Sequence, residues 1–200
     1  MKITLIIIAL IILTACQGQN TLIKYDNSYF KASPSATIEV TQELSVPANS
    51  ARAYFQSGEL LSHTGINHYN VSCEILVNTV SESRQIIAPG VFNVTSISQD
   101  ESPIVMRRTI QVAALSFNYQ QYALGGGGGG GSGGDSPVDI HRYYRFKLSA
   151  QDASKQKTQV RSLTCRGVLD EPYDADLPTF NEMQAAVGQY VKFDLKLIDM

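Results

Sequence analysis

Residues 69–77 read YNVSCEILV, and this stretch decides the fold class. Its odd positions carry Tyr, Val, Cys, Ile and Val, whereas Asn70, Ser72 and Glu74 occupy even positions. A period of two is typical of a β-strand with one buried face and one polar face. The pattern therefore predicts a half-buried strand in which Cys73 points into a core.

The same alternation recurs on both sides of this stretch, and one helix signal stands near the end of the chain. Thr179 and Glu182 have capping-box spacing, and Gly188 stands where a helix ends. We expect a mainly β fold, either an antiparallel β-sandwich or a small barrel, with one short C-terminal helix at about 179–187. The predicted strands cover residues 36–46, 51–61, 69–80, 86–87, 91–97, 104–115, 117–124, 138–148, 159–169 and 190–198.

Composition agrees with a β-rich domain of low charge. Charged residues make up 17 % of the chain, compared with about 25 % in typical soluble domains. The chain has ten Tyr and no Trp, and its formal net charge is −2. A near-neutral chain gives no general case for nucleic-acid binding. The length suits a single domain, with or without a tail.

The N-terminus has the features of a secretory signal. Lys2 supplies a positive charge, the run from Ile3 to Leu13 is apolar apart from Thr4, and polar residues 17–20 follow. The apolar run is shorter than the roughly 20 residues that a membrane-spanning helix needs. We therefore expect residues 1–15 to be a signal peptide that is removed.

Leu13-Thr14-Ala15-Cys16 resembles the lipobox of bacterial lipoproteins. The resemblance covers only the first residues of the chain. It implies that Cys16 carries a covalent diacylglycerol and an N-acyl chain, which hold the protein firmly on a membrane because more than one chain is attached. Gln17 stands where an Asp would favour the inner membrane, so the bacterial outer membrane is the expected location. No other cofactor is expected.

Cysteine usage then predicts a disulfide. The chain has three cysteines, and with Cys16 taken by lipid, Cys73 and Cys165 remain in an oxidising compartment. Cys165 shares an apolar strand face with Leu163 and Leu169. Two cysteines on buried strand faces have the geometry that a cross-sheet bridge needs. Two buried free thiols are the alternative.

The domain organisation follows from polarity and glycine content. Residues 16–35 are expected to form the lipidated N-terminus and a tether, whose aromatic patch at 25–30 can dock on the domain. Residues 36–200 are expected to form one β-rich domain. Residues 125–134 contain nine glycines and predict a flexible loop. Because Cys73 and Cys165 lie on either side of it, this loop is expected to join strands of one domain.

One stripe of side chains suggests a contact surface. Alternation places His141, Tyr143, Arg145 and Lys147 on the outward face of the strand at 138–148. Interleaved basic and aromatic residues can bind RNA, but an exported protein rarely meets nucleic acid. Lipopolysaccharide, anionic lipid headgroups or another envelope protein are the partners that this stripe would suit. An ordinary solvated strand face is the alternative interpretation.

No catalytic or metal-binding motif stands out. The chain lacks His-Glu-x-x-His and Cys-x-x-Cys, and the carboxylates at 170–176 lack the spacing of a calcium loop. We therefore expect a non-enzymatic interaction or structural module without metal. A β-barrel carrier of lipids or small ligands, with an internal apolar cavity, is the alternative. An enzyme would require His63, His68 or the carboxylates at 170–176 to converge in a cleft.

Overall fold

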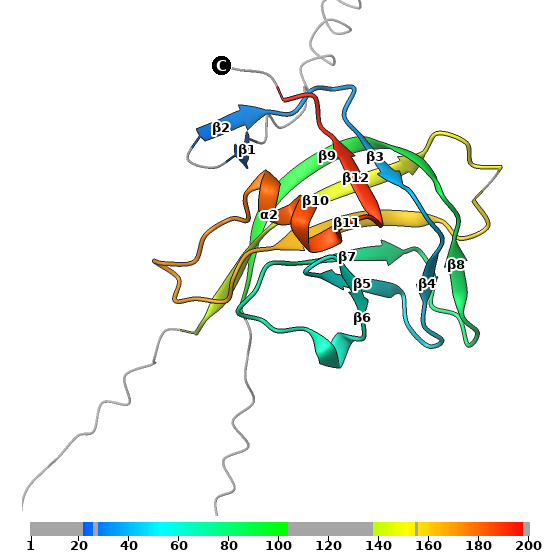
Figure 1. The fold of residues 1–200 in the computed structure, drawn as a ribbon, viewed down its shortest axis with the longest axis horizontal. Coiled ribbons are helices and arrows are strands. Elements are labelled where there is room, and N and C mark those ends of the chain that lie inside the picture. The colour runs from blue at the N-terminus through cyan, green and yellow to red at the C-terminus, as the bar shows by residue number, and fades with distance from the viewer. Residues whose placement is uncertain (1–21, 26–27, 104–137, 155, 198–200) are drawn as a thin grey trace, which may run out of the picture.

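The computed structural model describes residues 22–25, 28–103, 138–154 and 156–197. These residues form a mainly β fold with one short helix near the C-terminus, which confirms the predicted fold class (Figure 1). The main sheet is antiparallel, with strand order β12-β3-β9-β10-β11-β7-β5-β6, and β1–β2 and β4–β8 form two small sheets. The elements are β1 (Leu22–Tyr25), β2 (Ser28–Lys31), β3 (Thr37–Val40), β4 (Leu44–Val46), β5 (Arg52–Gln56), β6 (Glu59–Leu61), the 3-10 helix η1 (His63–Gly65), β7 (Ser72–Val77), β8 (Gln85–Ile87), β9 (Gly90–Pro103), β10 (Ile140–Ala150), β11 (Val160–Arg166), α2 (Phe180–Val187) and β12 (Val191–Asp194).

The eight-stranded sheet curls until its two ends approach each other around one core (Figure 1). The Phe193 ring on β12 lies 5.6 Å from the Phe146 ring on β10, although two strands separate β12 from β10 in the sheet. Phe55, on β5 near the opposite end, lies 5.8 Å from the Tyr190 ring. A register shift at Lys147 in the β9–β10 pair adds local bending, as bulges do.

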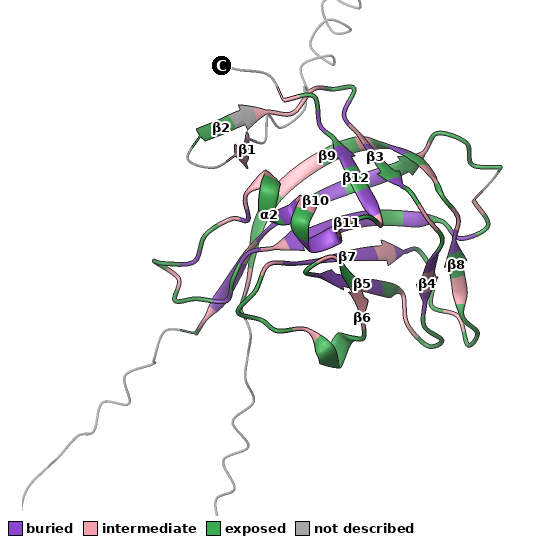
Figure 2. Cartoon of the chain, viewed as in Figure 1, coloured by how far each residue is buried: buried purple, intermediate pink, exposed green. Residues whose placement is uncertain are grey.

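Every second side chain along the strands points to the inside of the curled sheet, and these apolar side chains fill it. Buried segments line the interior in Figure 2, and the helix contributes to the same core. Removing these apolar side chains from water supplies the main force that holds the wall of the sheet together. The largest fully buried side chains include Tyr144, Phe55, Phe92, Phe146, Ile38, Leu163 and Met183.

The helix α2 begins and ends where the sequence predicts. The Glu182 backbone N–H donates to Thr179 Oγ1 at 3.3 Å, and the Thr179 N–H donates to Glu182 Oε2 at 2.7 Å. These two bonds complete the capping box and satisfy backbone donors at the start of the helix. Gly188 follows the last helical residue with a φ of 55°.

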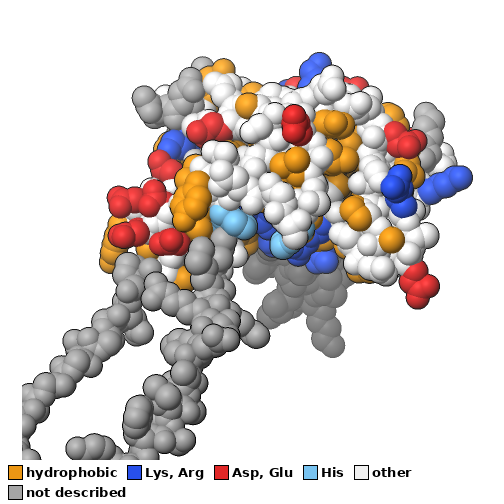
Figure 3. Space-filling model, turned by 60° about the horizontal axis from the view of Figure 1, so that its bottom comes forward, with side chains coloured by type: hydrophobic (Ala, Val, Ile, Leu, Met, Phe, Trp, Pro, Cys, Tyr) orange, Lys and Arg blue, Asp and Glu red, His pale blue; other side chains and the backbone are white. Residues whose placement is uncertain are grey.

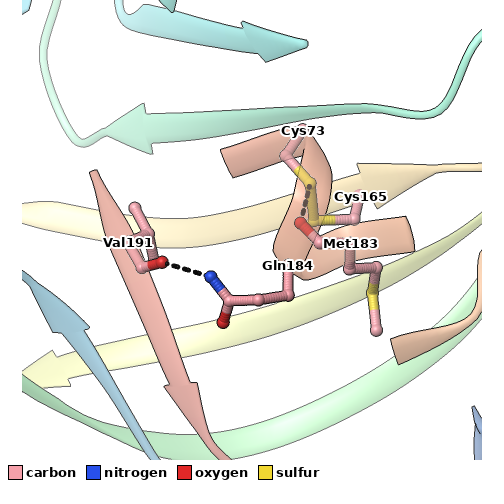
Figure 4. Close-up of a disulfide and its surroundings, with 5 residues drawn as sticks. All are labelled: Cys73, Cys165, Met183, Gln184 and Val191. Atoms are coloured by element: carbon pink, nitrogen blue, oxygen red, sulfur yellow. Dashed lines mark hydrogen bonds between the residues drawn. A yellow bond between two sulfur atoms is a disulfide. The ribbon is translucent and has the colours of Figure 1, made fainter. Parts of the chain in front are cut away.

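Helix α2 also bridges the two ends of the sheet. The Gln184 side chain donates to the Val191 carbonyl at 2.9 Å (Figure 4), which fixes the helix to β12. On the other side, the Gly58 N–H in the β5–β6 turn donates to the Ala186 carbonyl at 3.0 Å. The helix therefore covers the opening between the sheet ends and closes the core.

Cys73 and Cys165 form the predicted disulfide, with a sequence separation of 92. They lie directly opposite each other on the neighbouring strands β7 and β11, so the bridge joins two strands of one sheet. The Met183 carbonyl oxygen of α2 lies 3.9 Å from Cys73 Sγ (Figure 4). The bridge thus lies in the core beneath the helix, and a loop of this length implies a stabilisation of about 4–5 kcal/mol in the chain-entropy model.

Two segments predicted as single strands are interrupted. The stretch 36–46 divides into β3 and β4, because the Thr41 N–H leaves the β3 ladder and donates to the Tyr190 carbonyl at 3.1 Å. The stretch 51–61 is the β5–β6 hairpin. Ser57 and Gly58 have φ values of 53° and 79°, as a two-residue hairpin turn requires.

The expectation of a polar tether over 16–35 is wrong for residues 22–31. These residues include the β1–β2 hairpin, which packs on the domain. The Lys24 backbone N–H donates to the Tyr144 hydroxyl at 2.9 Å, and the Ile23 side chain is fully buried. The Tyr25 ring lies 5.6 Å from the Phe180 ring, which agrees with docking of the aromatic patch. The folded domain therefore includes this hairpin.

Several predicted features lie outside the described residues. They are Cys16 and its lipobox, the strands at 104–115 and 117–124, and the glycine-rich segment 125–134. Within the described part of the chain, no helix has the length and apolar character needed to span a membrane.

Candidate functional site

The second face of the main sheet, opposite the core, is polar. The alternation that buries Cys73 and Ile75 on β7 turns Ser72 and Glu74 to this other face. Ser72 and Glu74 are nevertheless buried. Polar side chains that are buried on the outer face of a sheet need partners across the neighbouring strands.

The partners of Glu74 are two arginines on the neighbouring strands. Arg166 Nη2 on β11 donates to Glu74 Oε1 at 2.8 Å, and Arg52 Nη1 on β5 lies 3.6 Å from Oε2. The Glu74 carboxylate raises the pKa of Arg52 by its negative charge. Oε2 itself is buried and accepts no hydrogen bond from the described residues. Arg52 therefore balances the charge on this oxygen without a hydrogen bond to it.

The predicted stripe on β10 shares this face, but only its second half is exposed. Arg145 and Lys147 are exposed, whereas Tyr143 is buried, so the expectation that Tyr143 faces solvent is wrong. The Tyr143 hydroxyl donates to Asp100 Oδ2 at 3.2 Å and accepts from Arg145 Nη2 at 3.1 Å. The Arg145 guanidinium carbon lies 5.1 Å from the centre of the Tyr143 ring. Burial raises the pKa of Tyr143.

His141, the first residue of the stripe, is also buried rather than solvated. Its Nδ1 lies 2.8 Å from the Gly167 carbonyl oxygen, so Nδ1 carries the proton and donates. Nε2 of the neutral ring then accepts from His68 Nδ1 at 3.2 Å. Burial is the largest cause that lowers the pKa of His141. The His141 ring therefore has a structural role, because it links β10 to the Gly167 backbone and to His68.

This face forms a polar hollow of about 640 Å³ that extends over β5, β7, β9, β10 and β11. Figure 3 shows Lys and Arg side chains gathered beside histidines at the lower border of the described surface. Guanidinium groups bind carboxylates and phosphates through paired hydrogen bonds. The polar side chains that line the hollow include Arg52, Glu74, Tyr143, Arg145, Lys147, Arg161, Ser162, Thr164 and Arg166.

The residues considered for catalysis do not meet in one cleft. The His63 ring on η1 lies 5.2 Å from the Tyr54 ring, whereas His68 contacts His141. Asp176, in the acidic loop, forms an ion pair with Lys24 at 2.8 Å. Within the described ranges, no three His, Cys, Asp or Glu side chains lie close enough to share a metal ion.

No family model, curated protein or solved structure matches the chain. The site therefore has to be interpreted from its own chemistry. Sequence patterns missed the contributions of Arg52, Glu74, Arg161 and Arg166. Alternation on residues 69–77 did place Glu74 on the polar face, but the strand neighbours that bring the arginines to it were not known.

Proposed function

We propose that the chain is a lipid-anchored, non-enzymatic protein of the bacterial envelope whose domain binds a partner through the polar hollow. The observation that carries this proposal is the gathering of arginines around a buried, incompletely bonded Glu74. A buried carboxylate oxygen without a hydrogen bond costs free energy, and such a group in a native structure calls for an explanation, of which a binding role is one. The hollow is lined mainly by polar side chains, which favours recognition of a polar partner over the carriage of a lipid chain.

The anchor part of the proposal rests on the lipobox resemblance at Leu13–Cys16. Diacylglycerol and an N-acyl chain on Cys16 would hold the protein on the membrane. Gln17 supports placement in the outer membrane. The partner would be another envelope component, such as lipopolysaccharide or an envelope protein.

The hairpin leaves the polar face free for that partner. The Lys24 N–H bonds to Tyr144, and Gln99 Nε2 donates to the Leu22 carbonyl at 2.7 Å. Tyr144 is a core residue, so the hairpin docks at the core side of the sheet. The hairpin that leads to the proposed membrane anchor therefore lies on one face of the main sheet, and the hollow lies on the opposite face.

Metabolic labelling with a clickable fatty acid tests the anchor. We expect the natural chain to take up label and to fractionate with the outer membrane, whereas Cys16→Ser takes up none. A second variant, Gln17→Asp, is expected to keep the label and to move to the inner membrane. Label on Cys16→Ser, together with its retention in the membrane fraction, would contradict the proposal.

A further inference from the structure

We propose that the polar hollow binds an anionic saccharide, with its negative groups held by the arginines and a hydroxyl group donated to Glu74. This inference rests on the proposed function, because it names the ligand class of the same face. The saccharide can be free or carried on a lipid, since the recognising chemistry is the same.

The hollow concentrates positive charge in a chain whose net charge is −2. Among the residues that the structure describes, five Lys and Arg side chains line it, against one carboxylate. Arg145 and Arg161 are exposed there, and Arg166 is partly exposed. Cations that crowd one hollow repel one another, and an incoming anion relieves that repulsion. The ligand is therefore negatively charged.

Glu74 distinguishes a saccharide from a simple anion. Its Oε2 is buried, accepts no hydrogen bond from the described residues and lies 3.6 Å from Nη1 of the half-exposed Arg52. When Arg52 turns towards a ligand anion, Oε2 opens to a donor, which a sugar hydroxyl offers and a carboxylate ligand does not. Arg166 already satisfies Oε1 of the same carboxylate. The side chains of Ser162 and Thr164 line the same hollow and provide further hydroxyl groups. A ligand that combines negative charge with several hydroxyls fits this set of side chains.

The size and lining of the hollow point to a short sugar chain. A volume of about 640 Å³ lies within the roughly 300–1,000 Å³ of small-ligand sites. A protein partner would instead cover about 800 Å² of surface. Leu76, Leu148 and Val160 are the apolar residues among those that line the hollow, which is too few to hold a hydrocarbon chain.

Calorimetric titration of the mature, lipidated chain in nonionic detergent tests the ligand class. The probes are tetragalacturonate, mannose 6-phosphate, neutral maltotetraose, inorganic phosphate and tetraglutamate. We expect at least one acidic saccharide to bind at least about tenfold more tightly than the last three probes, and to weaken as salt rises. Vesicles with and without lipopolysaccharide then distinguish a lipid-borne sugar from a free one, and binding to either source supports the ligand class.

Three variants locate the binding. The double variant Arg145→Ala/Arg161→Ala should weaken binding at least about tenfold. Lys192→Ala removes an exposed charge from β12, outside this hollow, and should change affinity less than about twofold. Glu74→Gln, checked for folding by its thermal midpoint, should weaken the saccharide and strengthen inorganic phosphate. A purely structural role for Glu74 would move both affinities in the same direction.

Several results would overturn this inference. They are equal binding of maltotetraose or inorganic phosphate, tighter binding of tetraglutamate, and no binding of either acidic saccharide up to about 10 mM. An unchanged affinity in the double arginine variant would do the same. If the chain is labelled at Cys16 but binds no acidic saccharide, the ligand assignment fails while the anchor proposal stands.

Discussion

At the scale of single residues, the Glu74 carboxylate is held inside the wall of the sheet by arginines from two neighbouring strands. Arg166 provides the shorter contact, at 2.8 Å. Removing one partner of a buried pair leaves a charge without compensation, which is costly. We expect Arg166→Met to lower the free energy of unfolding by about 3 kcal/mol, measured by urea denaturation.

Arg161 offers the matched control for this prediction. It lies on the same strand, is exposed, and forms no ion pair with the described residues. Arg161→Met should change the free energy of unfolding by less than about 0.5 kcal/mol. If both variants lose the same small amount of stability, the Glu74–Arg166 ion pair does not stabilise the folded sheet as predicted.

His141 should give the protein a pH-dependent stability. Its pKa is lowered, first by burial and then by the nearby His68 and Arg166, against the opposing hydrogen bonds to the backbone at Gly167 and Val168. The unfolded chain therefore binds a proton near pH 6.5 that the folded chain binds only at lower pH. Stability should fall as pH drops below about 6.5 and level off below the folded pKa. His141→Gln should remove this fall in urea unfolding curves recorded from pH 7.5 to 5.

The control for the pH prediction is His63. It is exposed on η1, and its ring packs beside the Tyr54 ring. His63→Gln should leave the loss of stability below pH 6.5 in place. A pH profile that is unchanged by His141→Gln but flattened by His63→Gln would assign the effect to the wrong histidine and refute the prediction.

Single residues also show what the sequence could and could not reveal about the site. Alternation placed Glu74 and Tyr143 on the polar face, because side-chain direction in a strand depends only on local geometry. It did not reveal that both are buried, since burial depends on neighbours such as Arg166 and Asp100 from distant parts of the chain. Of the four residues in the predicted contact stripe, only Arg145 and Lys147 are therefore exposed and able to contact a partner.

At the scale of elements, the end of α2 depends on a close contact between two glycines. Gly188 has a positive φ, and a Cβ at this position would lie 2.6 Å from Gly58 Cα. Either feature alone would strain any residue other than glycine at position 188. We expect Gly188→Ala to lower the free energy of unfolding by about 1–3 kcal/mol, measured by thermal and urea unfolding.

Gly65 is the control for this contact. A Cβ there would lie 3.5 Å from Ser62 Oγ, an ordinary contact, and no positive φ is required. Gly65→Ala should therefore change stability by less than about 0.5 kcal/mol. Equal losses in the two variants would mean that the glycine contact at the end of α2 adds no constraint of its own.

The elements differ in how well the sequence predicted them. The capping box at Thr179 and the stop at Gly188 were correct because they depend on a few consecutive residues. The division of 36–46 was missed, because the hydrogen bond that causes it comes from Tyr190. The disulfide was predicted from the pairing of cysteines, but the direct opposition of β7 and β11 required the structure.

At the scale of the whole molecule, the docked hairpin limits how far the domain can stand from its proposed anchor. Cys16 precedes Leu22, where β1 begins, by a short segment. At about 3.3–3.6 Å for each residue, this segment reaches roughly 20 Å when fully extended. The proposed protein would therefore work close to the membrane, within reach of the sugar headgroups of lipids.

The mainly β class was predictable because alternation repeats along the chain, whereas the strand order was not. β3 pairs with β9 and β12, and β7 pairs with β11, so several neighbours in the sheet are distant in sequence. Local patterns carry no information about these pairings. The curl, and with it the hollow, is a property of the assembled sheet.

Photo-crosslinking in living cells tests most directly whether the polar hollow is the binding face. A photo-crosslinking amino acid would replace Lys147, which is exposed in the hollow, or Lys192, which is exposed on β12 outside it. We expect irradiation to give a crosslinked product from position 147 and none from position 192, and the double variant Arg145→Ala/Arg161→Ala to reduce that product. A product from position 192 alone, or none from position 147, would contradict the proposed binding face.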